Sequence, residues 1–426
     1  MFYHISTLFQ RATHNKTVVN GGLFSLFSFF GQGVSFILLI LLANYIKPAE
    51  YGRLSLFTTV VTFVGFIMAF STRGYASVTF FKKDAEEFKK DFSATIILGL
   101  VSVALLALPI LLFGDWLSEK LELSNQLLWY VLIVSFFSLT FTLQQDYLRI
   151  KEEVVKYGIY NCSNAILNFA LSLLLVIAFE QSWMGRVNAS VICAFFWGLL
   201  SCVFFIRRDL IRVKIPWQNY RDALIWGLPM MPHVATGWLR QGLDRYIINY
   251  FYSVYEVGVF SFAMNLANII IMIGSAFNST NSVTIYQTLS DKTLTNEQKR
   301  TKLNRQTRFI FYVYIVATAA VLSGMTALTY FALPQYRESI PYMWVLSING
   351  LGNCIYFLYC NYLFYYGKTK TLMYITFGTS LMHVGLSLAL TRFSLYCTAL
   401  VYGSMMAFMT VLVIWQAKKL IREYLV

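Results

Sequence analysis

Charged residues are scarce in this chain. They make up 13% of its 426 residues, about half the usual share in a soluble globular protein, whereas apolar residues make up 58%. A soluble domain could not bury that much apolar surface, so an ordinary cytosolic enzyme is excluded. Disorder is excluded as well, because it requires low hydrophobicity and high charge. The composition therefore indicates a polytopic membrane protein.

Motifs that carry chemistry are missing too. The six cysteines lie in apolar stretches without CxxC spacing, so neither a disulfide framework nor a metal site is expected. The four histidines have no zinc spacing. Gly367-Lys368-Thr369 lacks the upstream glycine of a Walker A motif, since Tyr362 stands there, so ATP hydrolysis is not expected. No outer loop is large enough to organise carboxylates for glycosyl transfer. We expect a transporter without a cofactor, not an enzyme.

Twelve stretches are long and apolar enough to cross a bilayer, which takes about 20 residues. Their continuous runs, without two-residue alternation, exclude a transmembrane barrel. The first residues, 1–18, are polar and mixed, so no cleaved signal is expected. The predicted spans are 19–46, 54–80, 92–113, 126–146, 157–179, 184–206, 223–251, 258–284, 309–331, 341–366, 371–391 and 395–417.

The basic residues predict the orientation. If both termini lie inside, the inner segments hold 25 of the 34 lysines and arginines, the outer loops hold six, and three lie within spans. Positive residues favour the cytoplasmic side. The sequence therefore predicts that both termini lie in the cytoplasm. The net charge of +14 is then mainly a topology signal, and no nucleic-acid partner is expected.

An internal repeat suggests two lobes. Glu50-Tyr51-Gly52-Arg53-Leu54-Ser55-Leu56 is matched 206 residues later by Glu256-Val257-Gly258-Val259-Phe260-Ser261-Phe262, although two similar helix starts would also explain the match. Six crossings return the chain to the same side, so such repeats are parallel. We expect an all-α membrane fold of twelve helices, in two six-helix lobes around a central cavity. The predicted parts are an N-terminal lobe at 1–206, a cytoplasmic linker at 207–221 and a C-terminal lobe at 222–426.

The seventh predicted span carries three charged residues: Arg240, Asp244 and Arg245. Together they would cost roughly 8–10 kcal/mol if they faced lipid at the bilayer centre. We therefore expect them to face protein or water. Arg240 and Asp244 are four residues apart and are expected to pair on one helix face. The group is interpreted as an anion-binding cavity wall, or as a structural ion pair near the outer interface.

Further polar residues extend this interpretation. His233 continues the Arg240 face, and Pro229 and Pro232 lie below it, where they should kink the helix. Asp244 or His233 is a candidate for coupling transport to protons or sodium. Arg73, at the inner end of the second span, either binds phosphate or reaches lipid head groups. Stripes of asparagine and glutamine either hold helices together or line a hydrated cavity for a sugar; they include Gln32, Asn164, Asn265 and Asn268.

Two segments carry a resemblance to a known superfamily. Leu42-Ala43-Asn44-Tyr45-Ile46-Lys47-Pro48-Ala49-Glu50-Tyr51-Gly52 and Leu243-Asp244-Arg245-Tyr246-Ile247-Ile248 resemble the polysaccharide-export branch of the multidrug/oligosaccharidyl-lipid/polysaccharide exporters. Within it the chain looks like an O-antigen flippase of the Wzx type. The resemblance implies that a lipid-linked oligosaccharide on undecaprenyl diphosphate moves from the inner to the outer leaflet of the bacterial inner membrane. Related peptidoglycan-precursor flippases carry basic residues in the first span, whereas residues 19–46 hold none.

The resemblance also implies partners, and three other functions are the alternatives to a flippase. Membrane lipids, and a polysaccharide polymerase and ligase, are the expected partners. The alternatives are a drug/cation antiporter of the same superfamily, an O-antigen polymerase and a membrane scaffold. An antiporter should carry acidic residues in its N-terminal lobe, where Arg73 is the one mid-span charge identified. The expected substrate-binding residues are Arg240, Arg245, Arg73, Asn265, Asn268, Gln32 and Asn164.

Overall fold

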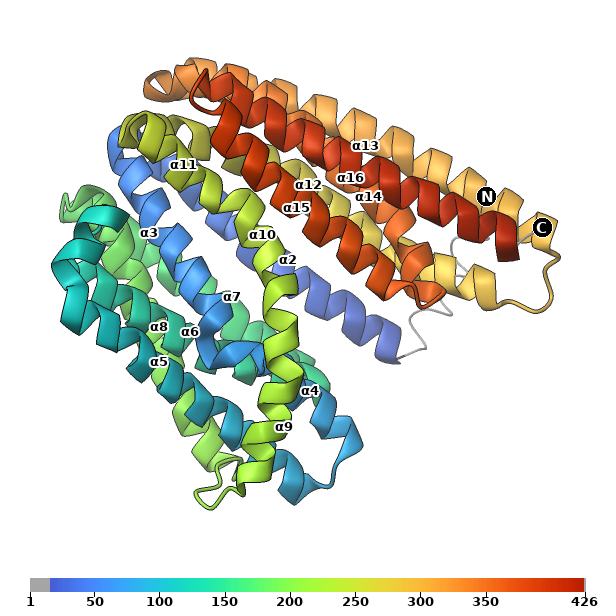
Figure 1. Cartoon of the computed structure of the whole chain (residues 1–426), viewed down its shortest axis with the longest axis horizontal. Coiled ribbons are helices and arrows are strands. Elements are labelled where there is room, and N and C mark those ends of the chain that lie inside the picture. Colours follow the sequence, from blue (N-terminus) through green and yellow to red (C-terminus); the bar gives the residue numbers. More distant parts are fainter. Residues whose placement is uncertain (1–15, 425–426) are drawn as a thin grey trace. The chain divides into compact units, whose positions relative to one another are not determined.

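The computed structural model describes residues 16–424, and in that range it is helical, without β-strands (Figure 1). The first elements are α2 (Lys16–Leu42), α3 (Pro48–Ile67), η1 (Met68–Ser71), α4 (Arg73–Lys82), α5 (Ala85–Leu121), α6 (Asn125–Ile150), α7 (Val154–Leu173), η2 (Leu174–Ala178) and α8 (Ser182–Arg207). The others are α9 (Trp217–Gly227), η3 (Leu228–Met230), α10 (Met231–Gln241), α11 (Leu243–Phe251), α12 (Val254–Ser290), α13 (Asn296–Ala332), η4 (Pro334–Ser339), α14 (Ile340–Tyr365), α15 (Thr369–Leu390) and α16 (Leu395–Tyr424).

Eleven helices of the described residues are long and apolar enough to cross a membrane. They correspond to all the predicted spans except the seventh. That stretch, predicted as one helix over 223–251, is divided into α9, η3, α10 and α11. The proline-dependent kink is confirmed, since Pro229 lies in the 3₁₀ turn η3 and Pro232 follows in the first turn of α10. A second break, at Gly242, separates α10 from α11 and was not expected.

The second predicted span is also broken. Between α3 and α4, the residues Ala69, Phe70 and Ser71 adopt positive φ angles of 53°, 51° and 57°. Non-glycine residues rarely do so, because the left-handed region crowds their Cβ atoms. The carbonyl oxygen of Phe70 lies 2.4 Å from where a Cβ on Gly227 would stand, so only glycine fits at the end of α9. The break thus packs against α9, directly before Arg73.

Local signals explain several helix ends. Asp84 caps α5 by accepting hydrogen bonds from the backbone N–H groups of Glu86 and Glu87. Thr295 and Gln298 form a capping box at the start of α13. Both helices have 37 residues. At 1.5 Å per residue each is roughly 55 Å long, well over the ~30 Å of bilayer hydrocarbon. Their ends therefore extend into the polar region.

The chain divides into two compact units. The first unit comprises Met1–Ile46 and Leu56–Met231, and the second comprises Lys47–Ser55 and Pro232–Val426. The helix α3 thus begins in the second unit and continues in the first. The lobe boundaries expected at 206 and 222 remain a prediction.

In the first unit, the segment after α8 is bound to the start of α5 by charged side chains. Arg212 donates hydrogen bonds to Glu86 at 2.9 Å and to Asp209 at 2.8 Å, and Lys89 lies 2.8 Å from Asp209. The hydrogen bonds from Arg212 and then Lys89 hold the pKa of Asp209 well below its ordinary value of 3.8. This end of the unit is therefore held together by charge.

A buried carboxylate attaches α9 to the same unit. Asp91 of α5 is fully buried, lies 2.8 Å from the Lys83 ammonium and accepts a 2.7 Å hydrogen bond from Asn219 of α9. Lys83 also donates to the Tyr75 hydroxyl at 3.3 Å. Burial disfavours the charged lysine, but its hydrogen bonds with Asp91 and Tyr75 raise the pKa of Lys83 above the usual value. The position of α9 is fixed by this cluster.

The second unit is built on long helices. Figure 1 shows α13, α14, α15 and α16 running alongside one another, and α12 packs on α14. One core cluster of this unit joins Leu363 of α14, Leu372 of α15 and Val413 of α16. Another joins Ile270 of α12 to Tyr314 of α13 and Cys354 of α14. All six cysteines are free thiols in this structure.

Candidate functional site

The broken seventh span places its charges on separate helices. Arg240 lies in the last turn of α10, whereas Asp244 and Arg245 lie in the first turn of α11. Because the helix is interrupted at Gly242, the four-residue spacing no longer brings Arg240 and Asp244 together. The expected Arg240–Asp244 ion pair is wrong: in the described part of the chain, Asp244 has other partners.

Those partners come from α15. One carboxylate oxygen of Asp244 lies 2.9 Å from Nε2 of His383, and the other accepts a 2.6 Å hydrogen bond from Ser387. All three side chains are fully buried. The other ring nitrogen of His383, Nδ1, has no hydrogen-bond partner among the described residues. The His383 and Tyr402 rings lie edge to face, with their centroids 5.5 Å apart. A buried acid and a buried imidazole thus share one hydrogen bond.

A chain of hydroxyl groups continues from this pair. Ser387 lies 3.5 Å from the hydroxyl of Thr391, which accepts a 2.9 Å hydrogen bond from Thr398 of α16. Within residues 16–424 no cluster of histidine, cysteine and carboxylate side chains is arranged to hold a metal ion. A carboxylate, an imidazole and three hydroxyl groups thus form one connected series of contacts that joins α11, α15 and α16.

Sequence reasoning missed His383. It is 139 residues from Asp244, so no local spacing connects the two. One signal was present: His383, Ser387 and Thr391 recur every four residues and thus share one face of α15. The other coupling candidate, His233, lies in α10, and its side chain is outside the described residues.

Among residues 16–424, Arg240 has no acidic partner. Its Nη1 group lies 3.6 Å from the Met406 sulfur and 3.5 Å from the Met409 sulfur, both on α16. Its Nε group is buried without a hydrogen-bond partner among the described residues, where no carboxylate forms a salt bridge with it. Thioether sulfur is only a weak acceptor. A half-buried guanidinium is therefore left with its charge uncompensated, which is costly unless an anion completes it.

Arg245 contacts a different group of residues, at the start of α12. Its Nε donates a 3.2 Å hydrogen bond to Ser261 of α12, which lies 2.7 Å from Ser55 of α3. One turn further along α12, the Asn265 amide donates to the hydroxyl of Tyr51. Two expected substrate contacts, Arg245 and Asn265, thus take part in the packing of α12 with the start of α3. Asn268 lies half-buried on the same helix.

The repeat segments contact each other reciprocally. A Cβ on Gly52 would stand 1.9 Å from the carbonyl oxygen of Val254, and a Cβ on Gly258 would stand 1.8 Å from that of Pro48. Gly258 and Val254 each lie 206 residues after Gly52 and Pro48, respectively. The two contacts are therefore equivalent under the repeat. The helix starts approach so closely that only glycine fits at either position.

The first unit holds the remaining candidates. Arg73 makes a bidentate ion pair with Asp146 of α6, at 2.6 and 3.2 Å, and Arg149 adds a longer contact of 3.6 Å. Asp146 is an acidic residue of this unit that the sequence analysis did not count. Half of the Arg73 side chain remains exposed, but its charge is already paired.

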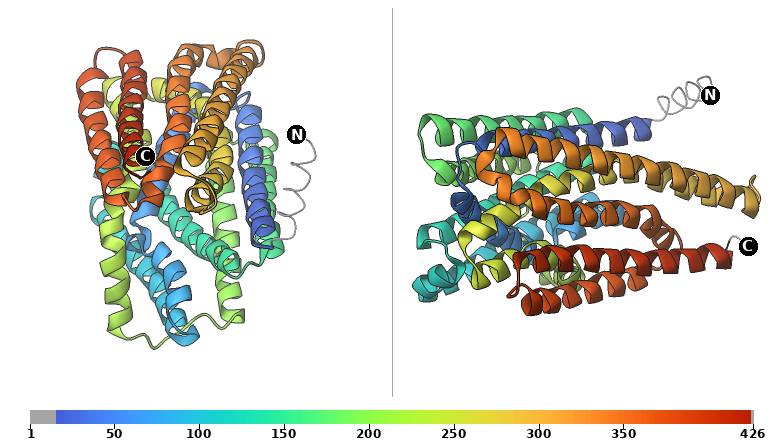
Figure 2. Two further views of the ribbon diagram at one scale, coloured as in Figure 1. Left: turned by 90° about the vertical axis from the view of Figure 1, so that its right-hand side faces the viewer. Right: turned by 90° about the horizontal axis from the view of Figure 1, so that it is seen from above.

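Gln32 and Asn164 lie on two adjacent helices. Figure 2 shows α2 running beside α7. Gln32 of α2 is exposed and donates a long 3.5 Å bond to Ser28, and Asn164 of α7 is half-buried. Asn161 of α7 donates a 2.7 Å hydrogen bond to the Phe27 carbonyl of α2. One asparagine of that stripe therefore holds helices together.

Comparisons with known proteins agree with this architecture. At 12% identity, the chain matches an inward-facing multidrug resistance MATE family transporter of the MOP superfamily with a TM-score of 0.72, covering 92% of this chain and 94% of that one. It matches the lipid II flippase MurJ in an inward closed conformation at 14% identity with a TM-score of 0.70, covering 94% and 89%. These likenesses identify the fold.

Sequence relatives extend over most of the chain. The "Lsg locus putative protein 1" of Haemophilus influenzae is 21% identical over 363 residues, which is 84% of this chain and 87% of the relative. An uncharacterized membrane protein of the same organism is 22% identical, covering 83% and 85%. The family model described as "Polysaccharide biosynthesis protein" matches residues 18–285. The chain therefore belongs to this polysaccharide biosynthesis protein family and is a multi-pass membrane protein.

Proposed function

We propose that the protein is a flippase for an oligosaccharide linked to undecaprenyl diphosphate, a repeat unit of O-antigen or a related surface polysaccharide. It moves the head group from the inner to the outer leaflet of the bacterial inner membrane. The family membership and the fold, shared with exporters and a lipid flippase, support a transporter of this type and not an enzyme. A polysaccharide polymerase and a ligase are the proposed downstream partners.

The observation that carries the substrate assignment is the uncompensated charge of Arg240. A drug cation would be repelled by a guanidinium that has only methionine sulfurs as partners. A diphosphate would supply the acceptors that its Nε and Nη groups lack. Arg73 is the weaker phosphate candidate, because Asp146 already neutralises it.

The proposed orientation follows the basic residues. With both termini in the cytoplasm, 25 of 34 lysines and arginines face inward. The shared fold supports alternating access, in which rocking of the two lobes exposes the head group first to one side and then to the other. The polar residues Gln32, Asn164 and Asn268 are proposed to solvate the sugar.

We assign coupling to Asp244 together with His383. With one proton the pair carries no net charge, either as a neutral acid beside a neutral imidazole or as an ion pair. A second proton would leave a positive charge in a fully buried site. A sodium ion prefers oxygen ligands, yet the histidine nitrogen occupies the position 2.9 Å from the carboxylate. This favours a proton over sodium.

The rival function is a drug/cation antiporter. Asp146 supplies an acidic residue in the first unit, which such a transporter requires, although Arg73 neutralises it at 2.6 Å. Deleting the gene and locating the labelled lipid-linked repeat unit separates the possibilities. For a flippase, the loaded carrier is trapped in the inner leaflet and surface repeat units disappear. Single units that still reach the surface, without long chains, would indicate a polymerase, and an unchanged glycan would favour the antiporter.

A further inference from the structure

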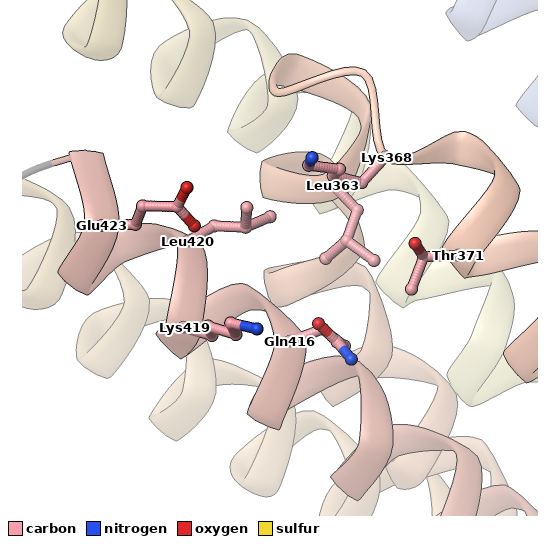
Figure 3. A pocket seen from close by; sticks show the side chains of 7 residues that line it. All are labelled: Leu363, Lys368, Thr371, Gln416, Lys419, Leu420 and Glu423. Atoms are coloured by element: carbon pink, nitrogen blue, oxygen red, sulfur yellow. The ribbon is translucent and has the colours of Figure 1, made fainter.

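A small polar cavity lies at one end of the second unit, between α16 and the turn that joins α14 to α15. Its volume is about 200 Å³. Figure 3 shows Gln416, Lys419 and Glu423 on one helix, facing Lys368 and Thr371 across the cavity. This end lies beside the C-terminus, the side that the proposed orientation assigns to the cytoplasm.

The cavity carries a surplus of positive charge. Lys368 and Lys419 line it, and neither forms an ion pair within residues 16–424. Glu423 is the one acidic residue in the lining, and it lies beyond salt-bridge distance from both lysines. The Thr371 hydroxyl adds a donor from the first turn of α15, a helix without a side-chain N-cap. Lysines and uncapped donors together suit a phosphate group.

Exposed apolar residues continue from the cavity along both helices. On α16, Trp415, Val411 and Phe408 precede Lys419 by four, eight and eleven residues, so they share its face. All three are exposed, as are Tyr374 and Leu381 of α15. A free phosphate ion makes no apolar contacts, so it would bind without this surface. A phospholipid would bind both parts, because its acyl chains cover apolar residues next to a basic head-group pocket.

We propose that this cavity binds the head group of an anionic phospholipid of the inner leaflet, with its acyl chains against the exposed apolar faces of α15 and α16. The ligand differs from the proposed cargo, and the site lies apart from Arg240 and Asp244. The assignment of a leaflet rests on the orientation in the proposed function. Binding itself does not, because the cavity and its lysines belong to the second unit alone.

The test measures lipid binding to the purified full-length protein. Native mass spectrometry gives the apparent Kd for phosphatidylglycerol and for phosphatidylcholine. The double variant Lys368→Gln/Lys419→Gln should bind phosphatidylglycerol roughly 25-fold more weakly, about fivefold for each lysine. The control variant Lys370→Gln/Lys418→Gln removes the same charge from neighbouring residues outside the cavity lining. It should retain nearly the original affinity.

Three results would overturn the proposal. They are equal losses in the two double variants, equal affinity for the two lipids, and displacement of phosphatidylglycerol by millimolar inorganic phosphate. Glu423→Gln supplies a test of opposite sign, since removing its charge should tighten binding severalfold. A protein that binds phosphatidylglycerol as expected but moves no lipid-linked glycan would contradict the proposed function without contradicting this lipid-binding site.

Discussion

The hydroxyl oxygens of Ser55 and Ser261 lie 2.7 Å apart, although 206 residues separate them in the chain. This separation equals the offset of the repeat, so each serine hydrogen-bonds to its own counterpart. Equivalent residues meet in this way only near the axis that relates the two repeats. The start of α3 and the start of α12 therefore pack around that axis, and Arg245 is anchored to the same contact.

This contact predicts a cross-link. Ser55→Cys together with Ser261→Cys should form a disulfide under mild oxidation, because the two Oγ atoms are already in contact. If rocking separates α3 from α12, the oxidised protein should lose at least about tenfold in surface polysaccharide delivery. Mass spectrometry of peptides detects the link, and each single variant is the control. Full delivery by the oxidised protein would exclude movement at this contact.

The close approach of the helices predicts a large effect of one methyl group. Gly258→Ala would place a Cβ 1.8 Å from the Pro48 carbonyl oxygen, so one helix must shift, at a cost of about 1–3 kcal/mol. Gly378→Ala is the matched control, since nothing lies within 4 Å of its Cβ position. There alanine should be neutral or stabilising by up to ~1 kcal/mol, because it favours helix. Thermal unfolding in detergent compares the variants, and equal midpoints would contradict the packing.

The charge of Arg240 predicts opposite effects on stability and on function. Arg240→Met removes a half-buried cation for which the described part of the chain supplies no acidic partner, so stability should hold or rise by about 1–2 kcal/mol. Delivery of lipid-linked glycan should nevertheless be abolished if Arg240 binds the diphosphate. Arg73→Met is the contrasting variant, because it removes the bidentate partner of the buried Asp146 carboxylate, which keeps the longer contact with Arg149, and it should destabilise the protein. Normal glycan delivery by Arg240→Met would show that Arg240 does not bind the diphosphate.

The cluster after α8 predicts a pH dependence. The bonds from Arg212 and Lys89 lower the pKa of Asp209, so its contribution to stability is present above pH 3.8 and is lost as the pH falls toward the folded value. Asp209→Asn should therefore unfold at lower temperature than the parent protein at pH 7. The difference should shrink below about pH 4 and in high salt. A gap that stays constant from pH 7 to pH 3 would argue against the ion pairs as its cause.

Much of the fold follows from the sequence because hydropathy and charge are local properties. Eleven spans and the kink near Pro229 were predicted correctly. The turn at Ala69–Ser71 was not, since it contains no glycine or proline to indicate it. Charge partners were missed for another reason: Arg73 and Asp146 are 73 residues apart, and only packing brings them together. Hydropathy identifies a buried charge, whereas its partner depends on tertiary structure.

The pair of Asp244 and His383 predicts which groups carry the coupling proton. Asp244→Asn retains the size of the side chain and can still hydrogen-bond to Ser387, but it cannot release a proton. Glycan delivery should fall roughly tenfold or more and should no longer respond to an imposed pH gradient. His383→Gln keeps a hydrogen-bonding side chain without a titrating ring, and it should produce the same loss of pH response.

The double variant separates coupling from structure. If the two residues act as one proton site, Asp244→Asn/His383→Gln should be no worse than either single variant, because the first substitution has already removed the function. If they merely stabilise the packing of α11 on α15, the losses should appear in thermal unfolding, with an interaction of about 0.6–1.7 kcal/mol, and transport should keep its pH response. Transport by Asp244→Asn at the parental rate across the whole pH range would rule out the pair as the coupling site.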